Sequence, residues 1–147
     1  MKVALIGNMN NNFFALMRYL LDLNVDAHLY LFRNEAAHFL PESDSFKPLN
    51  YQGRIHLLPF SNSIFDIIRI NGNVVNAIVG SYDILIGCGY APAYIAKAGR
   101  TLDIFSPYGS DFYAAPFIFK NIANRTHLLS YVAFLLRLPL YIYATVQ

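Results

Sequence analysis

The chain of 147 residues has no tryptophan, one cysteine and few charged side chains. The single thiol, Cys88, cannot form an internal disulfide, and it excludes metal sites that need two or more cysteines. One cysteine is typical of a reducing compartment. Charged residues make up 14% of the chain, whereas about a quarter is usual in globular domains. The formal net charge of +2 is too small to indicate binding to nucleic acid.

Hydrophobic residues are abundant instead, at 56% of the chain, and they include 11 tyrosines and 12 phenylalanines. Either a large apolar face is covered by something outside this chain, or the chain contacts a membrane. The apolar run that follows Lys2 is too short for the hydrophobic region of a signal peptide. We therefore expect a cytoplasmic protein, and the chain length favours a single domain.

Familiar catalytic motifs are missing. We find no Gly-x-Ser-x-Gly elbow, no Walker loop and no Cys-x-x-Cys pair. The four histidines show no metal-ligand spacing. His28 and His56 lie in strand patterns and are expected to be packed or edge histidines, whereas His38, in a polar segment, is the one histidine to consider for function.

The chain alternates between strand and helix patterns. Apolar strand-like runs occupy residues 2–7, 26–32, 55–60, 82–87 and 102–106, and helical periodicity occupies residues 12–23, 64–79 and 91–98. The polar residues 33–54 form an irregular excursion, and an Asn-Gly-Asn step weakens the middle of the helix over 64–79. This order predicts an α/β fold, namely a Rossmann-like open parallel sheet with helices on both faces.

Ligands of such sheets bind at the carboxyl ends of the strands. The loop after the first strand contains Gly7, Asn8, Asn10 and Asn11. A dinucleotide fingerprint needs three glycines, and only the first is present, which disfavours NAD and FAD. Asparagine tolerates left-handed backbone and offers donors and acceptors, which suits hydroxyl-rich ligands or a sugar diphosphate. The alternative is a tight turn with an asparagine N-cap.

Two further loops are expected at the same edge. Gly89 and Tyr90 follow the fourth strand, and the small residues there suggest close packing against a ligand or a neighbouring loop. Gly109, Ser110 and Asp111 follow the fifth strand. The carboxylate of Asp111 would accept hydrogen bonds from a substrate hydroxyl, or cap a following helix, or do both. Cys88 is not expected to be a nucleophile, because no His or Asp lies near it in sequence.

Near the end of the chain, residues 128–146 are nineteen residues that are nearly all apolar, with Arg137 and Pro139 near the centre. A membrane span needs about 20 apolar residues, and a central arginine costs about 2.5–3.5 kcal/mol on insertion. We therefore expect a helix that lies on a membrane or packs against another domain, in preference to a span.

Several segments in order resemble one enzyme family. Residues 7–12 with 14–20, 26–29, 38–44 and 107–111 resemble the N-terminal domain of bacterial family 4-like glycosyltransferases, which have two Rossmann-like domains in the GT-B architecture. The resemblance runs from residue 1 to about 113. It implies that the chain binds a saccharide or lipid-linked acceptor, that the loops at 8–12, 87–90 and 109–111 line the interdomain cleft, and that no metal or other cofactor is needed.

In that family a second domain holds the nucleotide-sugar donor, and residues 1–147 have no room for it. The resemblance therefore implies an acceptor-side domain that is inactive alone and that serves cell-surface polysaccharide synthesis on the inner face of the plasma membrane. The alternatives are a non-catalytic Rossmann-like binding or interaction module, and a peripheral membrane protein.

Overall fold

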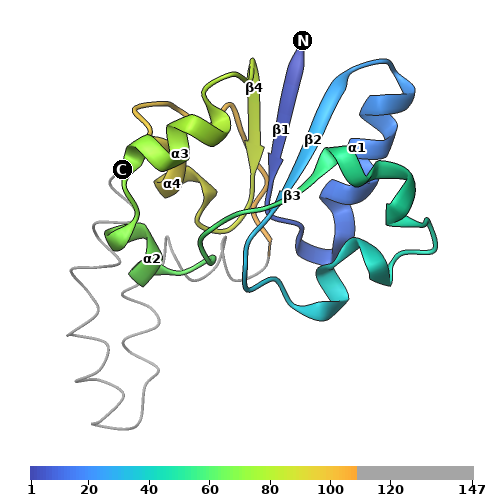
Figure 1. Ribbon diagram of the computed structural model, residues 1–147, viewed down its shortest axis with the longest axis horizontal. Coiled ribbons are helices and arrows are strands. Elements are labelled where there is room, and N and C mark those ends of the chain that lie inside the picture. The colour runs from blue at the N-terminus through green and yellow to red at the C-terminus, as the bar shows by residue number, and fades with distance from the viewer. Residues whose placement is uncertain (109–147) are drawn as a thin grey trace, which may run out of the picture.

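The computed structural model describes residues 1–108. Within them, five strands form one sheet of order β3-β2-β1-β4-β5 (Figure 1). The strands are β1 (Lys2–Ile6), β2 (Asp26–Leu31), β3 (Ile55–Leu57), β4 (Ile84–Gly87) and β5 (Ile104–Phe105). Every neighbouring pair of strands is parallel. The predicted Rossmann-like open sheet is confirmed, although most strands are shorter than the apolar runs suggested.

Helices cover both faces of this sheet, as predicted (Figure 1). The helices are α1 (Asn12–Asp22), α2 (Ile64–Arg69), α3 (Gly72–Val79) and α4 (Ala91–Lys97). Helix α1 packs on one face, and α3 and α4 pack together on the other. Asn24 follows α1 with a φ of 59°, so it ends that helix in the left-handed conformation.

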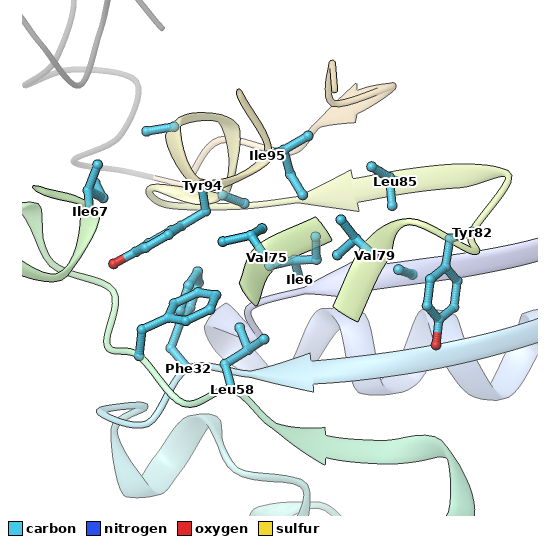
Figure 2. Packing of buried hydrophobic residues seen from close by; sticks show 14 residues of the cluster. Ile6, Phe32, Leu58, Ile67, Val75, Val79, Tyr82, Leu85, Tyr94 and Ile95 are labelled. Carbon is cyan, nitrogen blue, oxygen red and sulfur yellow. The ribbon is translucent and has the colours of Figure 1, made fainter. Parts of the chain in front are cut away.

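Alternation along the strands divides the apolar side chains between two cores. Leu5 of β1 and Leu29 of β2 face α1, where they pack with Phe14 and other fully buried side chains. The neighbouring Ile6 points to the opposite face, into the core that Figure 2 shows beneath α3 and α4. Its largest fully buried side chain is Tyr94. This two-sided burial explains why the strands are near-continuous apolar runs.

The single helix predicted over residues 64–79 is wrong. The structure has two helices, because Ile70 adopts an extended backbone with ψ of 137°. Asn71 then caps the second helix, and its side chain accepts a hydrogen bond from the backbone N–H of Asn73 at 2.9 Å. The weak Asn-Gly-Asn step is therefore a complete helix boundary.

Packing against α4 gives the physical reason for this break. A Cβ added to Gly72 would lie 1.9 Å from the carbonyl oxygen of Lys97, so the start of α3 touches the end of α4 where only glycine fits. The Lys97 ammonium donates to the carbonyl oxygens of Ile68 and Ile70 at 3.3 and 3.0 Å. The end of α4 thus satisfies carbonyls that the end of α2 leaves unpaired.

Residues 33–54 are irregular, as predicted, and contain three 3-10 helices: η2 (Ala37–Phe39), η3 (Pro41–Ser43) and η4 (Pro48–Arg54). They do not stand apart from the core. The Tyr51 ring meets Phe14 of α1 edge to face, with centroids 5.7 Å apart. The guanidinium of Arg18 lies 3.6 Å from the ring centroid of Phe46. This excursion therefore packs beside α1.

The apolar stretch over 128–146 lies outside the described residues. Among residues 1–108, no helix combines the length and apolarity needed to cross a bilayer.

Candidate functional site

The loops after β1 and β4 meet where the direction of winding of the sheet reverses. Strand β1 pairs with β2 on one side and with β4 on the other. The chain leaves β1 for α1 on one face and leaves β4 for α4 on the opposite face (Figure 1). Open α/β sheets bind ligands at such a switch point. Asn10 and Gly89 therefore lie at one edge of the molecule, as predicted.

Asn8 is at the centre of the β1 loop, and it is fully buried. Its side-chain oxygen accepts the backbone N–H of Phe14 at 2.9 Å. Its amide group donates to the carbonyl oxygen of Phe39 at 2.5 Å and to the side-chain oxygen of Asn11 at 2.7 Å. The backbone N–H of Asn8 donates to the Glu35 carboxylate at 3.1 Å. All these bonds are internal, so Asn8 holds the loop together and satisfies one backbone N–H in the first turn of α1, although the residue at the N-cap position of that helix is Asn11.

The hydrogen bonds of Asn8 reduce the number of unpaired N–H groups at the N-terminus of α1. A helix start normally offers unpaired N–H groups to a phosphate. Here the side chain of Asn8 takes the Phe14 N–H, and η2 packs against the turn η1 (Met9–Asn11). Burial raises the pKa of the neighbouring Glu35 carboxyl above its usual range. The loop therefore lacks the open cradle of a dinucleotide site, in agreement with its missing glycines.

Asn10 and Asn11 adopt the left-handed conformation, with φ values of 54° and 61°. Asn11 is half-buried, and its amide group donates to Asp44 at 3.4 Å. Asn10 is exposed. Asn12 is also exposed, and its amide group donates to the hydroxyl of Tyr108 at 2.7 Å. The β1 loop is thereby joined to the residues that follow β5.

A second set of asparagine contacts joins the loops after β2, β3 and β4. The side-chain oxygen of Asn62 accepts the backbone N–H of Tyr90 at 2.9 Å. The backbone N–H of Asn62 donates to the side-chain oxygen of Asn34 at 2.6 Å. Gly89 has a φ of 59°, and a Cβ there would lie 2.6 Å from the Asn62 amide nitrogen. Gly89 thus packs closely against a neighbouring loop, which was one of its two predicted interpretations.

The structure therefore brings together the predicted residues Asn8, Asn10, Asn11, Gly89 and Tyr90 at the carboxyl edge of the sheet. Gly109, Ser110 and Asp111 lie outside the described residues, so their predicted place in the cleft is untested. The sequence analysis included Asn12 in the loop 8–12 and Tyr108 in the segment 107–111 without giving either a role of its own, and it did not single out Asn34 or Asn62. Each lies within a few residues of the end of a strand, and that position was the signal that could have identified them.

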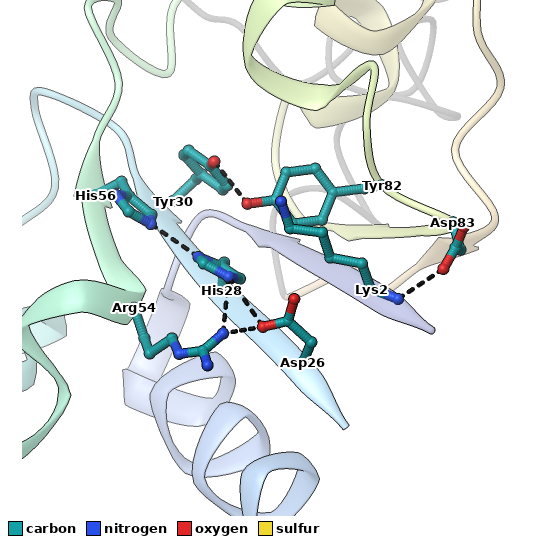
Figure 3. A network of polar contacts seen from close by, with 8 residues as sticks. All are labelled: Lys2, Asp26, His28, Tyr30, Arg54, His56, Tyr82 and Asp83. Carbon is teal, nitrogen blue, oxygen red and sulfur yellow. Dashed lines mark hydrogen bonds and ion pairs between the residues drawn. The ribbon is translucent and has the colours of Figure 1, made fainter. Parts of the chain in front are cut away.

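A separate polar cluster lies on the sheet nearer the amino ends of β1 and β2 (Figure 3). The rings of His28 and His56 stack, and their nitrogens Nδ1 and Nε2 are 2.9 Å apart. The second nitrogen of His28 lies 3.2 Å from the Asp26 carboxylate. The hydroxyls of Tyr30 and Tyr82 are hydrogen-bonded at 2.8 Å. The prediction that His28 and His56 are packed histidines is confirmed.

Burial and nearby positive charges disfavour protonation of this histidine pair. Burial lowers the pKa of His28, and the nearby ammonium of Lys2 lowers it further. The pKa of His56 is lowered by burial, then by His28, Lys2 and Arg54. Arg54 also pairs with the Asp26 carboxylate. The cluster binds its own members together, so we assign it a structural role.

His38 and Cys88 lie outside both of these groups of contacts. His38 is exposed, and its ring contacts that of Phe39 at a centroid distance of 4.0 Å. Cys88 is buried, with its sulfur 3.6 Å from the carbonyl oxygen of Ile6. Among residues 1–108, no group of three or more His, Cys, Asp and Glu side chains could hold a metal ion.

No protein family, curated protein or solved structure matches this chain. The fold and the geometry of the carboxyl edge are therefore the basis for any assignment of function.

Proposed function

We propose that this chain is the acceptor-side domain of a glycosyltransferase, which transfers a sugar from a nucleotide-sugar donor to a saccharide or lipid-linked acceptor. The observation that carries the proposal is the concentration of asparagine amides at the switch point of the sheet. Asn10, Asn12, Asn34 and Asn62 follow three different strands and lie at one edge. Asn12, Asn34 and Asn62 each use one side-chain atom in the internal hydrogen bonds described above. An amide has two N–H donors and an oxygen that can accept two hydrogen bonds, so each keeps capacity for a saccharide hydroxyl.

The form of the β1 loop supports an acceptor in preference to a donor nucleotide. A nucleotide-sugar carries a diphosphate, which binds well at an open helix N-terminus. At α1 the buried side chain of Asn8 already takes the Phe14 N–H. The backbone N–H of Asn8 in the same loop already donates to the Glu35 carboxyl at 3.1 Å, so it is not open to a diphosphate either. We therefore propose that the donor is held by a second domain, which also stabilises the departing diphosphate.

Binding of small saccharides tests this proposal directly. We would titrate the full chain with neutral oligosaccharides, lipid-linked saccharides and nucleotide-sugars, and record ¹H–¹⁵N spectra. We expect the backbone signals of Asn10, Asn12 and Gly89 to shift when an acceptor is added and to stay unchanged when a nucleotide-sugar donor is added. Donor binding to this chain alone would contradict the assignment. Binding of neither class would favour the alternative, a non-catalytic interaction module.

Matched variants separate a ligand contact from a folding effect. Asn10→Gly removes an exposed amide at the edge and keeps the left-handed backbone, with φ of 54°, that alanine would strain, whereas Asn50→Gly removes an exposed amide in η4. We expect Asn10→Gly to weaken acceptor binding by about tenfold, as loss of one well-formed hydrogen bond does. Asn50→Gly should leave binding unchanged, and equal losses in the two variants would refute a specific site.

We also propose that the protein associates with the inner face of the plasma membrane during polysaccharide synthesis. The proposal is based on the apolar composition of residues 128–146 and on the lipid-linked acceptors of the family that the sequence resembles. Flotation of the full chain with anionic and with zwitterionic vesicles tests it. Recovery with the anionic vesicles is expected, and absence from both vesicle fractions would refute it.

A further inference from the structure

A shallow cavity with two arginines lies at the carboxyl edge of the sheet, one strand away from the switch point. Its volume is ≈ 190 Å³. It lies between the ends of β2 and β3 and helix α2, which Figure 1 places at this edge. The residues that line it are Arg33, Pro59, Phe60, Asp66, Arg69 and Ile70. Ligand pockets for whole small molecules usually have about 300–1,000 Å³, so this one suits a single group of a larger ligand.

The charges in the cavity favour an anion. Arg33 and Arg69 contribute two positive charges against the one negative charge of Asp66. Arg33 reaches Asp66 only through an ion pair of 3.5 Å, and its side chain is 57% exposed. Among residues 1–108, no hydrogen bond or ion pair holds the Arg69 guanidinium. The Arg69 guanidinium, and that of Arg33 on breaking its single bond to Asp66, can turn toward an incoming carboxylate or phosphate, for which the geometry of a guanidinium is well suited.

The carboxylate of Asp66 is already committed to the local structure. It accepts the backbone N–H of Ser61 at 2.7 Å. The Asp66 backbone N–H in turn donates to the hydroxyl of Ser63 at 3.2 Å, which caps the start of α2. Asp66 thus holds the loop between β3 and α2 in place and only partly neutralises the two arginines. The other residues that line the cavity, Pro59, Phe60 and Ile70, are apolar.

The chain and its hydrogen bonds connect this cavity to the asparagines described above. Arg33 is followed directly by Asn34, which bonds to Asn62, and Asn62 bonds to the backbone of Tyr90 at the switch point. We propose that the arginine cavity binds an anionic group, a carboxylate or a phosphate, of a saccharide whose hydroxyls lie along the asparagines. This inference rests on the proposed function, and it narrows the acceptor to a negatively charged saccharide.

Three hexoses that differ at one carbon provide the probes. Glucose is neutral, glucuronate carries a carboxylate at carbon 6, and glucose 6-phosphate carries a phosphate there. We would titrate each into the full chain at low salt and follow the backbone signals of Arg33, Asp66 and Arg69. At least one charged hexose should bind about fivefold or more tightly than glucose, and added salt should weaken that preference. The comparison of the two charged hexoses distinguishes a carboxylate from a phosphate.

Two variants that change the net charge of the cavity in opposite directions test whether this charge binds the anion. Arg69→Gln removes an uncommitted guanidinium and should weaken the charged hexose by about fivefold to tenfold. Asp66→Asn keeps an oxygen for the Ser61 N–H but removes the competing charge, so it should strengthen binding by about twofold or more. Lys47→Gln removes an exposed positive charge in another part of the molecule and is the matched control. Equal effects of Arg69→Gln and Lys47→Gln would refute the site.

The possible results distinguish the two proposals. If glucose and the charged hexoses bind equally, and the arginine variant has no effect, the anion cavity is refuted while the acceptor site is supported. If inorganic phosphate binds at Arg33 and Arg69 but no hexose or oligosaccharide binds anywhere, the anion cavity is supported and the proposed function is refuted. If no probe shifts any signal, both proposals are refuted.

Discussion

Replacement of Asn8 by alanine tests whether the β1 loop is held by one buried amide. The backbone N–H of Phe14 would lose its acceptor inside the core, and a buried unsatisfied donor costs about 1–3 kcal/mol. Loss of the bond to the Phe39 carbonyl adds about 0.5–1.5 kcal/mol. The third partner, Asn11, can regain a hydrogen bond from water. We therefore expect the free energy of unfolding to fall by about 2–4 kcal/mol.

Urea unfolding of the full chain measures this loss. Because the sequence has no tryptophan, the transition is best followed by far-ultraviolet circular dichroism. The midpoint should fall without a change in slope, which means that stability changes and the exposed area does not. Asn12→Ala is the matched control, because it removes an exposed hydrogen bond of 2.7 Å to Tyr108 in the same loop. We expect it to cost about 0.5 kcal/mol.

A loss below about 0.5 kcal/mol for Asn8→Ala, or a loss equal to that of Asn12→Ala, would refute the reasoning. A further variant, Asn8→Asp, keeps an oxygen for Phe14 but loses both donors. Its carboxylate would face the carbonyl of Phe39, so the protein should be destabilised at neutral pH. Protonation of that carboxyl restores a donor, and part of the loss should therefore be recovered in acid.

Three further predictions concern packing and titration, each checked by denaturant unfolding. Gly72→Ala should destabilise the protein by about 2 kcal/mol or more, because the added Cβ would lie 1.9 Å from the carbonyl oxygen of Lys97. Helix propensity alone predicts the opposite, a stabilisation of about 0.5–1 kcal/mol, so a more stable variant would refute the close contact. Gly53→Ala is the control and should be nearly neutral, since open space surrounds Gly53. Gly7→Ala should destabilise the protein by about 2 kcal/mol or more, because Gly7 has a φ of 85° and the added Cβ would lie 2.5 Å from the sulfur of Cys88. An unchanged free energy of unfolding would contradict this backbone conformation and this contact. Folding lowers the pKa values of His28 and His56, so in mild acid the unfolded chain binds more protons than the folded one. The free energy of unfolding should therefore be largest above about pH 6.5, the ordinary pKa of histidine, and should fall as the pH is lowered below it. His28→Gln should flatten this dependence, and an unchanged slope would refute the assignment.

The class of fold could be predicted from the sequence because its signals are local. Runs such as residues 2–7 are apolar on both faces, which is typical of buried parallel strands. Helical periodicity between these runs then requires crossovers, and the carboxyl ends of the strands must meet at one edge. The residues Asn10 and Gly89 were placed at that edge by this reasoning alone.

The side-chain partners within the edge could not be predicted in this way. Glu35 lies 27 residues from Asn8 in the sequence and becomes its neighbour only when β2 pairs with β1. An asparagine in a loop looks the same in sequence whether it faces solvent, as Asn10 does, or is fully buried, as Asn8 is. The direction of each amide depends on how the excursion over residues 33–54 packs beside α1.

The sequence by itself determined the parallel sheet, the loops at its carboxyl edge and the left-handed turns, since each depends on residues close together in the chain. Only the tertiary structure showed that residues 64–79 form two helices, since Gly72 at the start of α3 packs against the distant carbonyl of Lys97. It likewise decided that Arg33 and Arg69 share one cavity. Contacts of this kind join distant segments, and periodicity along the chain carries no information about them.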